Sequence, residues 1–487
     1  MKTSEFGIPA KPPALDMYTQ RRWEHSALRR RLLIGDWQQD LERTLAQHIP
    51  SDRRAAWGVS DLSSNVFKSS VDALSALYND QPAVGLPSGS ADASSLLGSG
   101  GYLDKAGLWP LMQRVQSMTL GMREMLIRVD VNSKGNGLLF RPVTPDMVFA
   151  RAPAGDPMVP DVIHEMRLRY TKAGDPVWTA DVFDLRDLNN PIYRIQEVDA
   201  GGELGRDVTG EYMAESNYSG AAYPYRRADG TPVIPYSMYH ASMTGHLFSP
   251  YDLSEAVYGS LTAACLYTFA VHVLRDCSHP QRYVAGLQPA GAGIYDTDLT
   301  ARRAAIATDP ASILVFQIDT EIAGVGQPMI GQFNAGADPV SVFDSVTQYE
   351  RRVAAILGID PSDVQKMSGD PRSGYAIAIS RSGQRDAQRK YAPLFRYGDL
   401  QTIELAAIMA NRFLGQSLPE TGYTIEYQAI PLSDTEQKAQ REDLIEKLSK
   451  GLLTPIDAIK DLHVNMTDAE AVAYLREIRA QRAEFGF

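Results

Sequence analysis

The sequence has few of the residues from which metal sites, disulfides and hydrolytic triads are built. It contains 2 cysteines and 8 histidines in 487 residues. Cys265 and Cys277 lie in one apolar segment and form no disulfide framework, so we expect synthesis in a reducing cytoplasm. No HExxH, GxSxG or CxxC motif occurs, and the acidic residues are not clustered. The residues therefore give no positive indication of an enzyme, a metal centre or a cofactor site.

Positive charge and long apolar runs are also scarce. The net charge is -11, from 48 basic and 59 acidic residues, which excludes a protein that coats nucleic acid by neutralising its phosphates. The net charge does not exclude a protein that lets nucleic acid slide past its surface. The longest apolar run, residues 261–274, is interrupted by Thr and His and is short for a membrane span, so it predicts a helix buried in protein.

Residues 369–374, GDPRSG, have the glycine spacing of a phosphate-binding P-loop but not its chemistry. Tyr375 and Ala376 follow Gly374, where the motif needs a lysine and then a hydroxyl residue. The preceding segment is polar and turn-rich instead of a buried strand. The pattern predicts a flexible loop with Lys366 and Arg372 on it, followed by a helix.

Apolar periodicity predicts an α+β protein in which one antiparallel sheet region is followed by long helices. The expected elements are helices at 21–48 and 62–77, a helix running into a strand at 108–131, strands from 137 to 245, a helix at 251–278, β-like runs at 281–337, a helix at 338–358, a long helix kinked near Pro393, a strand at 422–431 and a helical tail from Asp434. Serine and glycine dominate residues 86–101, which indicates a surface loop.

Four segments, in this order, are similar to the portal proteins of tailed bacteriophages. They are NVFKSSVDALSALYNDQPAV, LLFRPVTPDMVFA, VTQYERRVAAILGIDPSDVQKMSGDPRSGYAIAIS and REDLIEKLSKGLLTPIDAIKDLHVNMTDAEAVAYLREI. The resemblance covers most of the chain and depends on the order and spacing of its elements. It implies a wing of mixed helices and antiparallel sheet, two long stem helices, a small α/β clip and a helical crown. The implied boundaries are 1–250 for the N-terminal wing, 251–280 and 338–358 for the stem helices, 281–337 for the clip, 359–374 for the tunnel loop, 375–433 for the wing helix and strand, and 434–487 for the crown.

The resemblance also implies a ring, usually of twelve copies, at one vertex of a virion capsid. Double-stranded DNA would pass through it during packaging and ejection, and the chain would be made in the bacterial host cytoplasm. The implied partners are further copies of the chain, the DNA, the terminase large subunit, a head-tail adaptor, and the major capsid and scaffold proteins, with no membrane and no cofactor. The residues implied to meet DNA in the tunnel loop are Lys366, Met367, Ser368, Arg372 and Ser373.

Two further sets of residues are candidates for subunit contacts. Arg381, Arg385 and Arg389 recur every fourth residue and form a stripe on the helix after the loop. They could contact phosphates or pair with an acidic neighbouring subunit, and the acidic composition favours pairing. The apolar face of the helix at 338–358 is expected to pack between subunits through Val342, Val346, Tyr349 and Val353. In the N-terminal helix, Arg21, Arg22, Arg29, Arg30 and Arg31 predict a solvated or scaffold-facing surface.

Two alternatives of other classes remain open. One is a cytoplasmic multi-domain enzyme whose active-site residues are distant in sequence. The other is a different virion connector or minor head protein. The two helices that flank an insert distinguish a portal from the connector, and ring formation without small-molecule activity distinguishes it from the enzyme.

Overall fold

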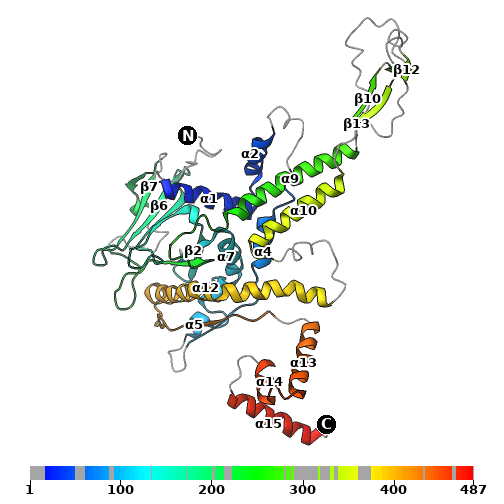
Figure 1. The fold of residues 1–487 in the computed structure, drawn as a ribbon. Helices are drawn as coiled ribbons and strands as arrows, with labels where there is room; N and C mark the ends of the chain where they lie inside the picture. Colours follow the sequence, from blue (N-terminus) through cyan, green and yellow to red (C-terminus); the bar gives the residue numbers. More distant parts are fainter. Residues whose placement is uncertain are drawn as a thin grey trace.

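The computed structural model mixes helices with small antiparallel sheets (Figure 1). It describes residues 17–49, 61–86, 93–132, 134–171, 173–199, 203–212, 222–278, 281–285, 287–289, 316–318, 329–333, 338–359, 374–430, 434–462 and 468–485. A body of helices and sheets carries a pair of helices that extends away from it and ends in short strands.

Two helices open the described chain, where the sequence predicted one helical region. Helix α1 spans Met17–Ile34 and α2 spans Gln38–His48. Gly35 lies between them with φ 89°, a left-handed conformation that costs glycine little, so the helix ends there.

The prediction of a solvated arginine face on α1 is wrong for its two most buried members. Arg22 and Arg29 are 3% and 1% exposed. Arg22 donates to the carbonyl oxygens of Pro145 and Val148 at 2.9 and 2.7 Å, and its guanidinium stacks 3.8 Å from the ring of Phe248. Donation from a buried guanidinium to backbone carbonyls is a structural use of arginine that helical periodicity cannot reveal. On the same helix, Arg30 and Arg31 pair with Asp146 and Asp40.

Four further helices complete the N-terminal part of the body. They are α4 (Val66–Leu74), α5 (Ser94–Leu97), α6 (Tyr102–Lys105) and α7 (Leu108–Met122), and strand β1 (Ala83–Gly85) lies between the first two. The Asn65 side chain caps α4 by accepting from the backbone N–H of Lys68 at 3.0 Å. Helix α7 is buried along most of its length and runs directly into a strand whose residues are all buried.

The two largest sheets of the described chain are both antiparallel. The three-stranded sheet has the order β3-β2-β9, and the five-stranded sheet has the order β4-β5-β6-β7-β8. The strands are β2 (Glu124–Val131), β3 (Leu138–Val143), β4 (Val148–Arg151), β5 (Val162–Tyr170), β6 (Pro176–Asp184), β7 (Ile192–Val198), β8 (Leu204–Asp207) and β9 (Tyr236–His240), with 3-10 turns at Pro145–Met147 and Thr209–Glu211. Every residue of β2 is buried, because strands pair on both of its edges and helices α7 and α12 pack against it.

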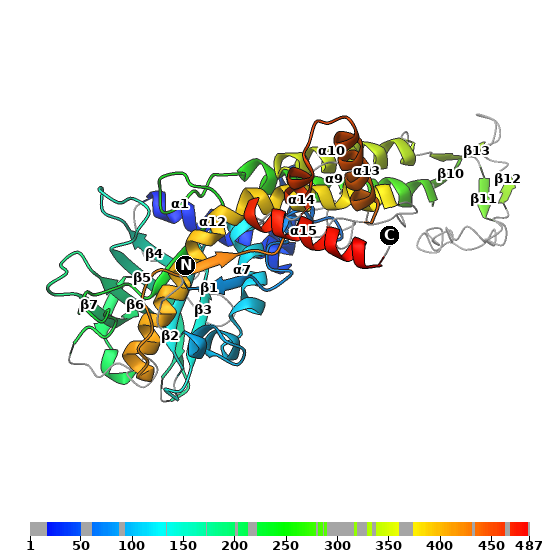
Figure 2. The ribbon, with the colours of Figure 1, turned by 90° about the horizontal axis from the view of Figure 1, so that it is seen from below.

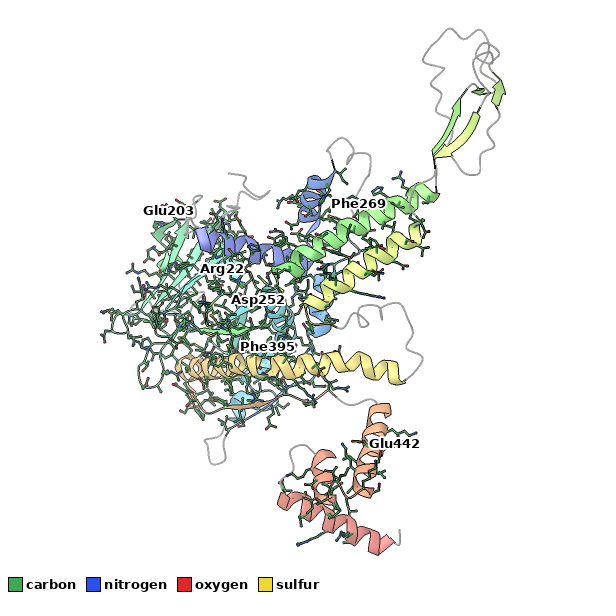
Figure 3. The ribbon with its side chains drawn as sticks, viewed as in Figure 1. Arg22, Glu203, Asp252, Phe269, Phe395 and Glu442 are labelled. Atoms are coloured by element: carbon green, nitrogen blue, oxygen red, sulfur yellow. The ribbon has the colours of Figure 1, made fainter. Side chains whose placement is uncertain are left out.

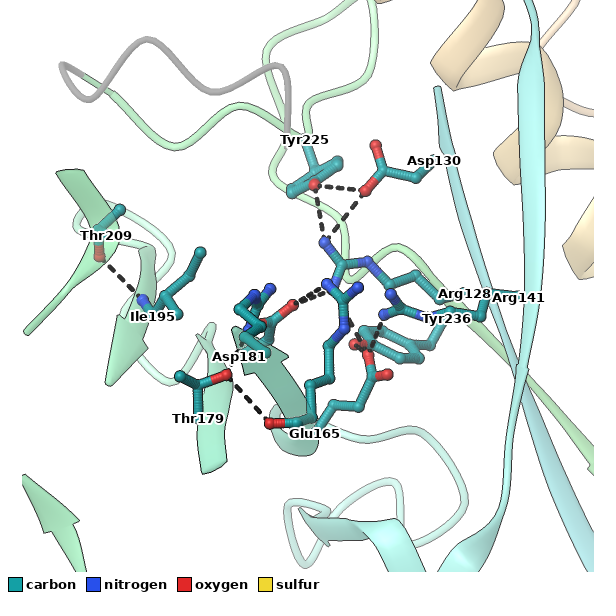
Figure 4. Close-up of polar contacts among 12 residues, drawn as sticks. Arg128, Asp130, Arg141, Glu165, Thr179, Asp181, Ile195, Thr209, Tyr225 and Tyr236 are labelled. Atoms are coloured by element: carbon teal, nitrogen blue, oxygen red, sulfur yellow. Dashed lines mark hydrogen bonds and ion pairs between the residues drawn. The ribbon is translucent and has the colours of Figure 1, made fainter. Parts of the chain in front are cut away.

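A buried ionic network joins the two sheets (Figure 4). Arg128 on β2 pairs with Asp130 at 3.0 Å, with Glu165 on β5 at 3.4 Å, and with Asp181 on β6. Arg169 also pairs with Asp181, at 2.8 Å. Burial opposes the charge on Asp181, but Arg128 and Arg169 together hold the pKa of its carboxyl below the usual value. Because all the partners are desolvated, we expect the network to specify how the two sheets pack more than to add net stability.

The second half of the chain is mostly helical. Helix α9 (Ser254–Ser278) leads to strands β10 (Gln281–Ala285), β11 (Leu287–Pro289), β12 (Phe316–Ile318) and β13 (Met329–Phe333), from which α10 (Pro339–Ile356) returns to the body. Strand β10 pairs with β13, and β11 pairs with β12, both antiparallel. The two helices lie within three residues of the ends expected from sequence.

Helix α12 (Gly374–Leu414) is the longest element and crosses beneath the body, with its N-terminal end on the same side as α9 and α10 (Figures 1 and 2). It continues through Pro393 as one helix. Strand β14 (Thr424–Glu426) pairs with β1, and α13 (Asp434–Ser449), α14 (Pro455–Leu462) and α15 (Asp468–Phe485) follow. The last three helices pack on one another and contact α12 through α13.

Candidate functional site

The antiparallel pair of α9 and α10 is the feature that most distinguishes this molecule from a compact globular protein. The helices approach so closely that a Cβ atom on Gly259 would lie 2.9 Å from Cγ2 of Val353. Further out, the rings of Tyr267 and Phe343 meet edge to face at 5.9 Å between centroids. Helix α10 begins at an N-cap, Asp338, whose carboxylate accepts from the Ser341 N–H at 3.0 Å. The pair is therefore joined by side-chain packing along its length.

By length and composition, part of α9 could cross a bilayer, with a mean hydropathy of 1.5 over Ser254–Arg275. Its body half is buried instead against α2, α4 and α10, through residues such as Val257, Leu261 and Cys265. Core helices of this kind pass the same test of length and composition. The contacts agree with the sequence expectation of a helix buried in protein.

The base of α9 is held to the body by four charged side chains. Arg29 donates to the carbonyl oxygens of Gly121, Pro250 and Asp252, and Arg123 pairs with the Asp252 carboxylate at 2.7 Å. Glu124 accepts from the Ser249 N–H at 2.6 Å. Burial raises the pKa of Glu124 to about 7, although the nearby arginines act in the opposite direction.

Two left-handed residues, Arg123 and Leu253, shape this joint, with φ of 77° and 57°. Figure 3 shows Asp252 on the body side of α9 and Phe269 on its extended part. The joint therefore sets the direction in which the helix pair leaves the body.

Helix α12 is fixed by a carboxylate that accepts from three tyrosines. The hydroxyls of Tyr78, Tyr427 and Tyr239 donate to Asp399 at 2.7, 2.6 and 2.9 Å. Burial raises the pKa of Asp399 to about 6, and the three hydrogen bonds partly oppose that rise. Next to it, Gly398 lets the Tyr239 ring approach so closely that a Cβ atom would lie 2.7 Å from it. Sequence analysis missed this cluster because its members come from four segments far apart in the chain.

Some of the predicted site residues lie outside the described part of the chain, and others lie on α12. Lys366, Met367, Ser368, Arg372 and Ser373 all lie outside the described residues. On α12, the Arg381 side chain also lies outside them, whereas Arg385 is half-buried and has a partner, and Arg389 is exposed. The stripe lies in the N-terminal half of α12. Its assignment to DNA or to a neighbouring subunit stays a prediction.

The apolar face of α10 is largely covered within one chain. Val346 and Val353 are 5% and 2% exposed, and Val353 packs against Gly259 of α9. Val342 and Tyr349 are half-buried. Their proposed role between subunits stays untested, but the two buried valines already have partners in their own chain. The more exposed apolar residues of the helix pair, Leu274, Val340 and Ile356, offer more surface to a neighbour.

Metal-ligating side chains are not clustered in the described part of the chain. No group of three or more His, Cys, Asp or Glu residues that could hold a metal ion occurs there. Burial raises the pKa of the Cys265 thiol to about 11, which makes it a poor nucleophile, and lowers the pKa of His240 to about 4. Both residues behave as parts of the core.

Comparison with known proteins finds matches among solved structures. No family model matches the chain, and no curated protein matches it. A chain of a structure titled "Virion of native gene transfer agent (GTA) particle" is 11% identical to it, with a TM-score of 0.39, covering 82% of this chain and 89% of that one. A likeness at this level carries no argument about function, so the function proposed below rests on the geometry of this chain.

Proposed function

We propose that this chain is the subunit of a portal: a homo-oligomeric ring that forms a channel for double-stranded DNA at one vertex of a virion. The observation that carries the proposal is the helix pair α9–α10, which projects from the body and is bridged at its far end by short β-strands. A projecting pair of packed helices can line up side by side around an axis and leave a hole at the centre. The same pair favours a portal over a connector that lacks stem helices.

The charge distribution supports passage of DNA without tight binding. With -11 on each copy, a ring of twelve would carry a formal charge of 12 × -11 = -132. Such a ring repels phosphates on average, and a few exposed basic residues such as Arg389 and Lys390 on α12 give local attraction only. Strong binding would stop the DNA from sliding.

Two acidic residues of α10, Asp344 and Glu350, are candidates for the channel wall. Asp344 is exposed and remains one. Glu350 accepts a hydrogen bond from the Ser64 hydroxyl of the same chain, so its carboxylate already has a partner. We therefore expect the Asp344→Asn substitution to slow DNA packaging, and Glu350→Gln to act mainly on stability.

The first experiment is native mass spectrometry of the full chain with negative-stain imaging of the same sample. Twelve copies of 53.6 kDa give about 640 kDa, and we expect a ring with a central hole. Leu274→Asp and Ile356→Asp, both on exposed apolar positions of the helix pair, should reduce ring formation while the monomer stays folded. Compact monomers or dimers at every concentration, in the presence and absence of scaffold protein, would contradict the proposal.

A further inference from the structure

A groove of about 300 Å³ lies between α12, strand β9, the turn before β9 and the loop that follows β4. Its floor is apolar and consists of Tyr236, Met238, Leu405 and Ile408, which are all buried. Its rim is open to solvent, since Val159 is 41% exposed. No described residue of the helix pair lines it.

Two oppositely charged side chains line the groove without forming an ion pair with each other. Glu404 on α12 and Arg227 before β9 are both half-buried. Among the described residues, neither side chain makes a hydrogen bond or an ion pair, although Arg227 is near enough to influence Glu404 electrostatically. Burial raises the pKa of Glu404, which reflects the partial loss of water around an unpaired carboxylate. A ligand that supplied partners to both groups would recover that cost of desolvation.

The size and openness of the groove favour a peptide over an enclosed small molecule. A volume of this size admits roughly two or three large apolar side chains, and pockets for small molecules usually surround their ligand. Apolar side chains on the floor, a cation beside Glu404 and an anion beside Arg227 would match the groove in both shape and charge.

We propose that this groove binds a short peptide segment of a partner protein, in which large apolar side chains are flanked by one basic and one acidic residue. The proposal is independent of the portal function, which rests on the helix pair and not on this groove.

The test is a selection of random heptapeptides, displayed on a filamentous phage coat protein, against the immobilised full chain. Parallel selections use Val159→Asp, which places a charge on the rim, and Leu452→Asp, the same type of change at an exposed position between α13 and α14. We expect peptides with the proposed pattern to be enriched on the wild type and on Leu452→Asp, but not on Val159→Asp.

The leading peptide is then synthesised with a fluorophore, and its affinity is measured by anisotropy. Glu404→Gln and Arg227→Gln should each weaken binding by about tenfold, because each removes one charge-assisted contact and leaves the apolar floor intact. Three results would overturn the proposal: no enriched pattern, equal enrichment on Val159→Asp, or affinity unaffected by both charge removals. Enrichment of a segment of this chain would replace the partner protein by a second copy and would also overturn it.

Discussion

At the scale of single residues, the most consequential group is the buried guanidinium of Arg128. It pairs with Asp181, Glu165 and Asp130 at the contact between the two sheets, where all four side chains are buried. Removing one member of a buried ionic group leaves the others desolvated without compensation. The loss of Arg128 should therefore cost more stability than the intact network contributes.

We expect Arg128→Met to lower the free energy of unfolding by about 3–5 kcal/mol, because it removes a buried partner from three buried carboxylates, although Asp181 keeps Arg169 and Glu165 keeps Arg141. Urea denaturation followed by circular dichroism measures the change. Arg186→Met is the control, since Arg186 pairs with Asp184 on the exposed surface and its removal should change stability little. Equal losses for both variants would show that the network does not behave as a buried one.

The Asp399 carboxyl predicts a pH dependence of stability with a defined sign. Its pKa is about 6 in the folded chain, above the ordinary value of 3.8, because of burial. The folded state therefore holds this proton to higher pH than the unfolded state, and the associated stability is present below pH 3.8 and lost as pH rises to about 6.

The Asp399→Asn substitution should remove that loss, which is on the order of 3 kcal/mol. The measurement compares the free energy of unfolding of both proteins at several values from pH 4 to pH 7. Asp386→Asn, an exposed position on the same helix, should retain the wild-type slope. A parallel pH profile for wild type and Asp399→Asn would mean that the carboxyl titrates normally.

At the scale of elements, the position of α12 depends on the absence of a side chain at Gly398. The Tyr239 ring of β9 occupies the space where a Cβ atom would lie, at 2.7 Å. Tyr239 cannot move freely, because its hydroxyl donates to Asp399 and also bonds to Thr402. Close packing of Tyr239 on Gly398 therefore fixes the position of α12 relative to β9.

We expect Gly398→Val to destabilise the fold by about 1–3 kcal/mol, because the added atoms overpack this contact. Thermal unfolding measured by calorimetry reports the change. Gly155→Val is the matched control, since nothing lies within 4 Å of a Cβ atom there. Retention of the wild-type melting temperature in Gly398→Val would show that α12 moves away from β9 at little cost.

At the scale of the whole molecule, the arginine stripe of α12 tests how copies of the chain contact one another. If Arg389 pairs with an acidic neighbour, Arg389→Gln should lower the salt concentration at which the ring dissociates, since it removes an intersubunit ion pair. Light scattering across a series of sodium chloride concentrations measures this. Arg476→Gln, exposed on α15, is the control. An unchanged ring with slower DNA passage would assign the stripe to DNA instead.

The sequence by itself determined the elements whose causes are local. The helices α9 and α10 were predictable because apolar periodicity, the Asp338–Pro339 start and Gly358 act over a few residues. The antiparallel strands between 137 and 245 followed from alternation and turn residues in the same way. The break at Gly35 was missed, because an apolar pattern continues across it and only the backbone conformation ends the helix.

Only the tertiary structure decided which polar residues act together. Arg22 and Arg29 look like surface residues of an amphipathic helix, but their partners are carbonyl oxygens more than ninety residues away. The Asp399 cluster, the Arg128 network and the groove beside Glu404 likewise draw on segments that are distant in the chain. Local rules cannot foresee these contacts, because burial and charge pairing depend on what the folded chain brings together in space.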